Sequence, residues 1–229
     1  MNKKCVVLCI ALGIMSVVRS QNSPCLCQSV EGYNKWLNNN MVGYIYTNAV
    51  QGFKGERFYG EWRTGTVYLT SGDSITGVHL RYEKYQDELL FLNSEVKAGV
   101  LYKPEVRGFT LYDGTVGRHV FIRRALKLNP GDRADSHYLQ LLQPGKLSFH
   151  VLRRSIINNT GNALQNSDKY YVLYNNQFYP LRLKRRDFVN LPFADKSTMK
   201  RVLQNVKLRV NTEEGMKSAV ERYNSGANL

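Results

Sequence analysis

The chain is poor in cysteine, which excludes a fold held together by a network of disulfides. Four cysteines occur in 229 residues, and two of them fall in an N-terminal apolar run. Cys25 and Cys27 are one residue apart, so a disulfide between them would close a strained loop. They could instead pair between chains or bind a soft metal, and these alternatives stay open.

The chain also lacks an apolar segment long enough to span a membrane. Its longest apolar run, residues 5–18, is shorter than the roughly 20 residues that a transmembrane helix needs. Two lysines precede the run and Ser20 follows it, which is the pattern of a cleaved export signal. We expect residues 1–20 to be a signal peptide and residues 21–43 to be a flexible leader. The expected product is exported and is periplasmic, outer-membrane-associated or secreted, with no transmembrane segment after cleavage.

Recognisable catalytic motifs are missing as well. No serine lies in a glycine-flanked nucleophile elbow, and the four histidines fall in separate segments. Carboxylates that could pair for glycoside hydrolysis are nevertheless present. They are Glu56, Glu61, Asp73, Asp87 and Glu88. An envelope glycan hydrolase, or a metal-dependent hydrolase, is therefore the alternative function, with catalytic residues unknown.

One polar loop contains residue types that can bind metals. Asn129, Asp132, Asp135 and His137 lie around Gly131, and their oxygen and imidazole groups could hold calcium or a transition metal. The spacing does not match an EF-hand loop, and a solvated turn uses the same residue types for its own backbone. We favour the turn and expect no metal or other cofactor. Asp132, Asp135 and His137 are kept as the alternative metal ligands.

What the chain does contain is the pattern of a β protein. Fifteen tyrosines and nine phenylalanines favour strands, and short alternating runs recur with turn sequences between them. The predicted hairpins pair residues 58–69 with 75–82, 109–112 with 116–122, 138–142 with 147–152, and 170–174 with 178–183. We expect residues 44–183 to form an antiparallel β-meander that makes a sandwich or partly open barrel. The polar stretches 129–136 and 158–169 are expected to be loops.

The C-terminal segment, residues 184–229, changes to a helical period. Two sets of apolar residues recur at i, i+3, i+4 and i+7, which predicts helices near 196–206 and 213–224 and a shorter one near 185–190. Asp195 and Thr212 are the predicted N-caps. We expect this helical tail to pack on the β-structure as part of the same domain, so that the fold class is mainly β (α+β).

Basic residues outnumber acidic ones, and they are concentrated near the C-terminus. Lys and Arg total 32 against 18 Asp and Glu, and removal of residues 1–20 leaves a net charge of about +11. The candidate anion-binding residues are Arg182, Lys184, Arg185, Arg186, Lys200 and Arg201. Such a surface in a cytoplasmic protein would indicate nucleic acid, but export makes that partner unlikely. An anionic envelope glycan, a lipid headgroup such as that of lipopolysaccharide, or an acidic protein surface fits better, and a charge that only maintains solubility is the alternative.

Several segments together resemble a group of small exported β-rich proteins of unknown function that are common in Bacteroidota. The resemblance covers most of the chain after the expected signal, and its motifs are packing positions. They are the runs Trp62–Leu69, Leu80–Tyr82, Tyr170–Val172 and Glu221–Asn224. The resemblance implies an envelope location and a β-meander with a helical tail, and it transfers no catalytic residue. We therefore expect a non-catalytic envelope protein that binds or scaffolds an anionic partner.

Overall fold

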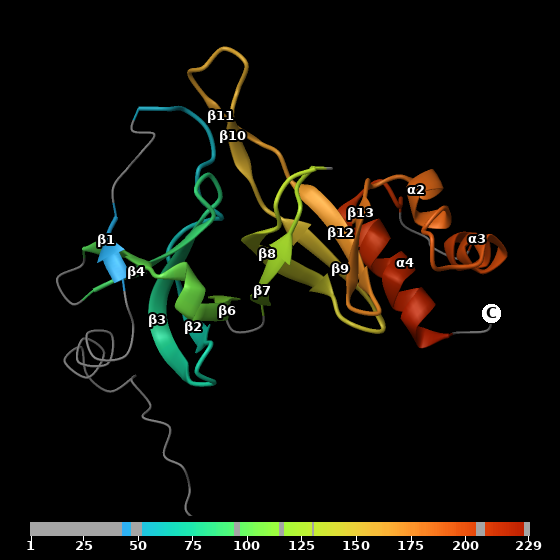
Figure 1. Cartoon of the computed structure of the whole chain (residues 1–229), viewed down its shortest axis with the longest axis horizontal. Helices are drawn as coiled ribbons and strands as arrows, with labels where there is room; N and C mark the ends of the chain where they lie inside the picture. The colour runs from blue at the N-terminus through green and yellow to red at the C-terminus, as the bar shows by residue number, and fades with distance from the viewer. Residues whose placement is uncertain are drawn as a thin grey trace, which may run out of the picture.

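The computed structural model describes residues 43–46, 52–93, 97–114, 117–129, 131–204 and 209–226. The expected signal peptide and nearly all of the expected leader lie outside these residues. Eleven of the described strands form one sheet in the order β1-β5-β4-β3-β2-β6-β7-β8-β9-β12-β13, and β10 and β11 form a separate two-stranded ribbon (Figure 1). The strands are β1 (Gly43–Ile45), β2 (Arg63–Leu69), β3 (Ser74–Glu83), β4 (Glu88–Leu92), β5 (Ala98–Leu101), β6 (Val106–Asp113), β7 (Gly117–Leu126), β8 (Asp135–Gln143), β9 (Leu147–Leu152), β10 (Ser155–Ile157), β11 (Leu164–Asn166), β12 (Lys169–Tyr174) and β13 (Gln177–Leu181).

The predicted antiparallel meander is confirmed, and the sheet is not closed into a barrel. Its end strands, β1 and β13, lie at opposite ends of the strand order. All four predicted hairpins form, as β2–β3, β6–β7, β8–β9 and β12–β13. In the last of these, Asn175 and Asn176 have φ of 47° and 61°. A two-residue hairpin turn that matches the twist of its strands needs positive φ at both positions, and asparagine tolerates it better than most residues.

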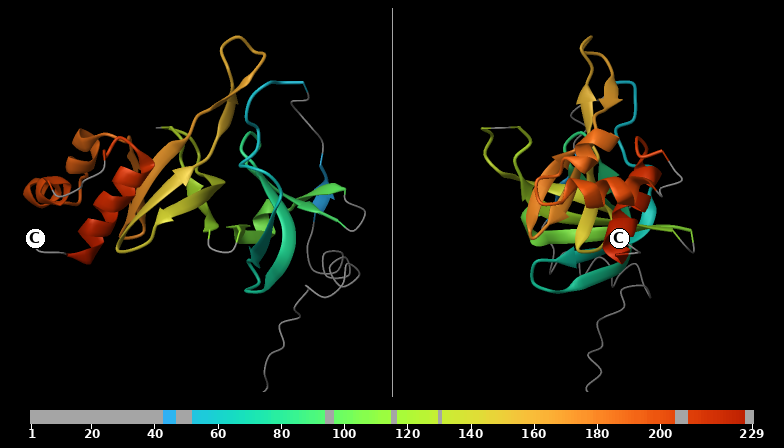
Figure 2. Two further views of the ribbon diagram at one scale, coloured as in Figure 1. Left: turned by 180° about the vertical axis from the view of Figure 1, so that it is seen from behind. Right: turned by 90° about the vertical axis from the view of Figure 1, so that its right-hand side faces the viewer.

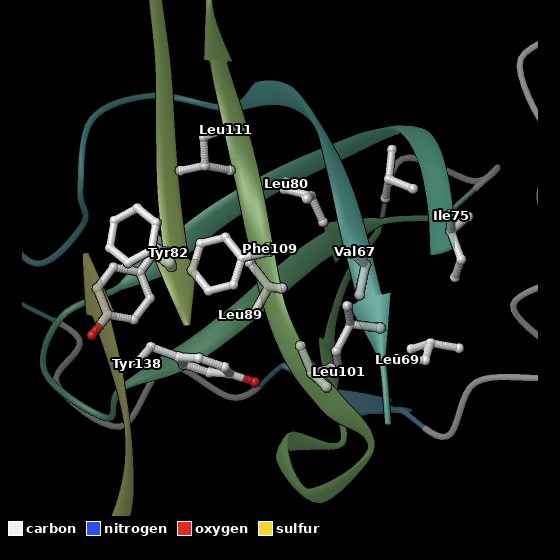
Figure 3. Packing of buried hydrophobic residues seen from close by; sticks show 13 residues of the cluster. Val67, Leu69, Ile75, Leu80, Tyr82, Leu89, Leu101, Phe109, Leu111 and Tyr138 are labelled. Atoms are coloured by element: carbon white, nitrogen blue, oxygen red, sulfur yellow. The ribbon is translucent and has the colours of Figure 1, made fainter. Parts of the chain in front are cut away.

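The first hydrophobic core lies within the N-terminal part of the sheet. Strands β2 to β8 supply its side chains, which point toward one another between the strands (Figure 3). Tyr82, Phe109, Phe121 and Tyr138 form its aromatic centre, and the rings of Phe109 and Phe121 stack with centroids 4.6 Å apart. Packing of this kind contributes beyond the burial of apolar area, so this core can hold the sheet together without disulfides.

The second core lies between the sheet and the C-terminal helices. The helices are α2 (Arg185–Val189), α3 (Lys196–Gln204) and α4 (Glu213–Ser225), and a short 3-10 helix, η2 (Lys103–Glu105), precedes β6. The helices lie together at one end of the molecule and cover β9, β12 and β13 (Figures 1 and 2). Phe188, Met199 and Met216, one from each helix, are fully buried there. The helical tail predicted from the apolar period is therefore confirmed.

Both predicted N-caps are also confirmed. The side chain of Asp195 accepts a hydrogen bond from the Thr198 amide at 2.8 Å, and the Thr212 hydroxyl accepts one from the Gly215 amide at 3.2 Å. These bonds satisfy amide donors that have no partner inside the helix. The caps fix where α3 and α4 begin, and so fix which side chains each helix exposes.

The expectation of a loop over residues 158–169 was wrong in part. Leu164–Asn166 pairs with Ser155–Ile157 to make the β10–β11 ribbon, which projects away from the sheet (Figures 1 and 2). The segment near Gly55 supports this ribbon, because the Leu164 amide donates to the Lys54 carbonyl at 2.7 Å. Only Leu164 in the strand is apolar, so the alternation that predicts a strand is missing. The loop expected over 129–136 similarly ends at Asp135, where β8 begins.

Candidate anion-binding face

Helices α2 and α3 are short amphipathic helices whose outer sides are basic. In α2, Phe188 and Val189 turn into the second core, while Arg185 and Arg186 are exposed. In α3, the residues buried at i, i+3 and i+4 leave Lys200 and Arg201 in solvent. We define the basic cap as six exposed residues of this region: Lys184, Arg185, Arg186, Lys200, Arg201 and Arg209.

The basic cap has one acid beside it, Asp187, whose carboxyl feels the charges of Lys184 and Arg186 but forms its ion pair with Arg182. Among the described residues, none of its six side chains takes part in an ion pair. Residues 182–204 and 209–226 contain ten basic and five acidic side chains, and three of those acids, Asp187, Glu213 and Glu214, are already paired with cations outside the cap. The cap therefore presents positive charge that a partner can use.

An open pocket of about 610 Å³ lies within the basic cap. Its walls include Lys184 and Arg185 at the start of α2, Leu203 at the end of α3, and Arg209 before α4. Arg209 belongs to the basic run of the C-terminal segment but is not among the six candidate residues predicted from the sequence, and its place beside Lys184 depends on how the helices pack. Arg186, Lys200 and Arg201 are exposed but do not line this pocket.

Arg182 differs from the other candidate residues because it forms an ion pair with Asp187. Its Nε donates to Asp187 Oδ2 at 2.6 Å, and its Nη2 donates to Asp187 Oδ1 at 3.4 Å. The hydrogen bond from Arg182 holds the pKa of the Asp187 carboxyl below its usual value. Arg182 is therefore part of an ion pair at the edge of the cap and is not available as a free cation.

A second pocket, of about 630 Å³, adjoins the first. Leu183 lines both pockets, and the second extends from it along the ends of β12 and β13. Its walls combine apolar groups with both signs of charge. They are Leu128, Asp168, Lys169, Tyr170, Tyr171, Pro180, Leu181, Arg182, Leu183 and Asp187.

Arg153 ties the helical layer to the sheet next to the second pocket. Its guanidinium donates to both carboxylate oxygens of Glu213, at 2.6 and 2.8 Å, and to Asp168 at 2.8 Å. Its Nε donates to Gln140 at 2.8 Å. Burial alone would raise the pKa of Glu213, but the bonds and charge of Arg153 outweigh it, and the pKa lies below its usual value. Because Glu213 is the first residue of α4 and Asp168 lines the second pocket, this network positions both.

The alternative metal ligands do not come together. Asp132 accepts hydrogen bonds from the backbone and side chain of Asn129, at 3.0 and 2.8 Å, which is the geometry of a closed polar turn. Asp135 accepts from the amide of Ser136 at 2.7 Å, while His137 Nδ1 lies 2.9 Å from Asp87. Within the described residues no group of three or more His, Cys, Asp or Glu side chains could hold a metal ion.

The carboxylates considered for hydrolysis have separate structural partners. Glu56 contacts Lys84 and Asn166, Glu61 pairs with Arg81, Asp73 accepts from Ser71, and Glu88 accepts from Tyr44. Asp87 is the most enclosed of the five: Tyr82, Lys103 and the Tyr138 amide donate to it, and it contacts His137. With φ of 57°, Asp87 forms the β3–β4 turn. These contacts give each carboxylate a local role in the fold.

His119 is likewise engaged by protein groups. Its Nδ1 lies 3.2 Å from the Tyr59 hydroxyl and 3.3 Å from Gln140 Nε2. Burial, and then the nearby charge of Arg63, lower the pKa of His119. His119 therefore contributes to the polar contacts beside the first core, against which Tyr59 packs.

Comparison with protein-family models, curated proteins and solved structures finds no match to this chain. Over the described residues, no helix combines the length and the apolar character that crossing a membrane requires.

Proposed function

We propose that this protein is an exported, non-catalytic envelope protein that binds an anionic partner through the basic cap. The observation that carries the proposal is the gathering of six exposed cations, none of which forms an ion pair within the described residues, on α2, α3 and the segments before α2 and α4, with Lys184, Arg185 and Arg209 sharing one pocket. An envelope glycan, a lipid headgroup or an acidic protein surface provides the matching charge. The expected export signal and the resemblance to exported Bacteroidota proteins support the location.

The electrostatics of the cap also favour binding over a purely solvated surface. Charges of one sign that lie around a concave surface attract counter-ions more strongly than the same charges dispersed on a convex one. Arginine adds paired donors that match carboxylate and sulfate oxygens. The amide and the hydroxyl of Thr212, the N-cap of α4, both donate to the Arg209 carbonyl. The backbone of Arg209 is therefore fixed at the start of α4, and less ordering is needed when a partner binds.

Retention on immobilised heparin tests this proposal. The variant Lys184→Gln, Arg185→Gln, Arg186→Gln should elute at clearly lower salt than the wild type, because it removes three contacts whose contribution is screened by salt. The matched control replaces three exposed arginines of β6 and β7, as Arg107→Gln, Arg118→Gln, Arg124→Gln, and removes the same charge.

The control variant should elute close to the wild type. Equal shifts for the two triple variants would mean that net charge alone is responsible, and a wild type that passes through the column unretained would also contradict the proposal.

A further inference from the structure

The second pocket has a different chemistry from the basic cap that it adjoins. Its two carboxylates are each paired with an arginine, Asp168 with Arg153 and Asp187 with Arg182. Both carboxylates are mostly covered, with side chains 20% and 18% exposed. The pocket therefore offers hydrogen-bond acceptors and donors with nearly balanced charge, next to a pocket that is strongly positive.

The ligand group that fits this second pocket is neutral and rich in hydroxyls. Ionised carboxylates only accept hydrogen bonds, so a hydroxyl can donate to them, whereas the balanced charge of this pocket gives a phosphate or a second carboxylate no net attraction. Lys169 supplies a donor, and Leu128 and Pro180 supply apolar walls. Apolar walls with a few placed polar groups are typical of small-molecule sites.

We propose that the anionic partner is an acidic glycan in which charged and neutral sugar units alternate. The acidic unit lies in the first pocket among Lys184, Arg185 and Arg209, and the neighbouring neutral unit lies beyond Leu183 in the second. This inference rests on the proposed function and narrows its partner from any polyanion to a chain of alternating sugar units. The shared wall at Leu183 is what makes one continuous ligand possible.

The test measures binding of two probes to the full chain. A hyaluronan octasaccharide alternates glucuronate with neutral N-acetylglucosamine, while linear polyphosphate carries charge on every unit. Pro180→Trp should fill the second pocket without changing charge, since Pro180 is exposed and lines that pocket. We expect it to weaken hyaluronan binding about tenfold and to leave polyphosphate binding within about twofold. Pro192→Trp, exposed between α2 and α3 and outside both pockets, is the control and should change neither.

A second variant keeps the test decisive if Pro180→Trp does not fold. Asp187→Asn replaces one acceptor oxygen of the second pocket by an amide donor and removes the charge that pairs with Arg182, so hyaluronan binding should weaken while polyphosphate binding strengthens. Tighter binding of both probes by Asp187→Asn, or no effect of Pro180→Trp on either probe, overturns the proposal that the partner is an alternating glycan. Binding of polyphosphate without hyaluronan overturns it too but keeps the proposed function. If the wild type binds neither probe, the proposed function itself fails.

Discussion

At the scale of single residues, His150 shows how the buried sheet opposes a charge. It is 1% exposed on β9; its Nε2 lies 2.8 Å from the Ser148 hydroxyl, and the ring of Phe178 lies edge-on to it. Burial, and then the charge of Arg124, lower the pKa of His150 to about 4. In the unfolded chain the pKa returns to about 6.5.

The pH dependence of stability follows from that difference. The unfolded state binds the proton first, so the stability present above pH 6.5 is lost as the pH falls toward 4. The His150 contribution to the loss is about 3 kcal/mol. His150→Gln, neutral throughout, should lack this contribution, and the difference between the two proteins in urea unfolding at pH 7 and pH 4 measures it. A difference that stays constant with pH would contradict the lowered pKa.

The exposed cations could be predicted from the sequence, whereas the ion pairs could not. The candidates Lys184, Arg185, Arg186, Lys200 and Arg201 could be identified from their local density and from the helical period that places them opposite apolar residues. The bonds of Arg153 could not, because its main partner Glu213 is 60 residues away in the chain. The pairing of Arg182 with Asp187 could not be predicted either, because the sequence alone does not show which of several nearby cations forms an ion pair with an acid.

At the scale of elements, α4 allows two adjacent acids to be compared. Glu213 is bound by the mostly buried Arg153, whereas Glu214 pairs with Lys217 and its side chain is 69% exposed. Both lie in the first turn and interact alike with the helix dipole. Glu213→Gln should lower the free energy of unfolding by about 2 kcal/mol, and Glu214→Gln should change it by less than about 0.5 kcal/mol. Chemical denaturation of both variants checks this; equal losses would show that the dipole, and not Arg153, determines the effect.

Elements with strong local signals were the ones that could be predicted. The four hairpins have turn residues such as Asn175–Asn176, and α3 and α4 have both an apolar period and a capping residue. Strand β5 has neither: it is four residues long, and its Gly99 leaves room for the Phe91 ring, which would have to shift to accept a Cβ that lay 2.6 Å from it. That requirement comes from a neighbouring strand, so the sequence of β5 alone does not show it.

At the scale of the whole molecule, the core that stabilises the sheet and the surface proposed to bind a partner lie in different parts of the structure. The first core lies inside the N-terminal part of the sheet, and the basic cap lies over the second core, at the end opposite β1 (Figure 1). The positive net charge could be predicted from composition. The gathering of the six cap residues on one surface could not, because it depends on how α2 and α3 pack. Changes at the cap should therefore leave the sheet intact and alter binding only.

Amide hydrogen exchange of the full chain, with and without heparin, tests most directly whether the basic cap is the binding surface. Binding through the basic cap predicts slower exchange in peptides that cover residues 182–204 and 209–216, and unchanged exchange in β2 to β7. Slower exchange over β6 and β7 instead, or no change anywhere at saturating heparin, would contradict the assignment of the basic cap as the binding surface.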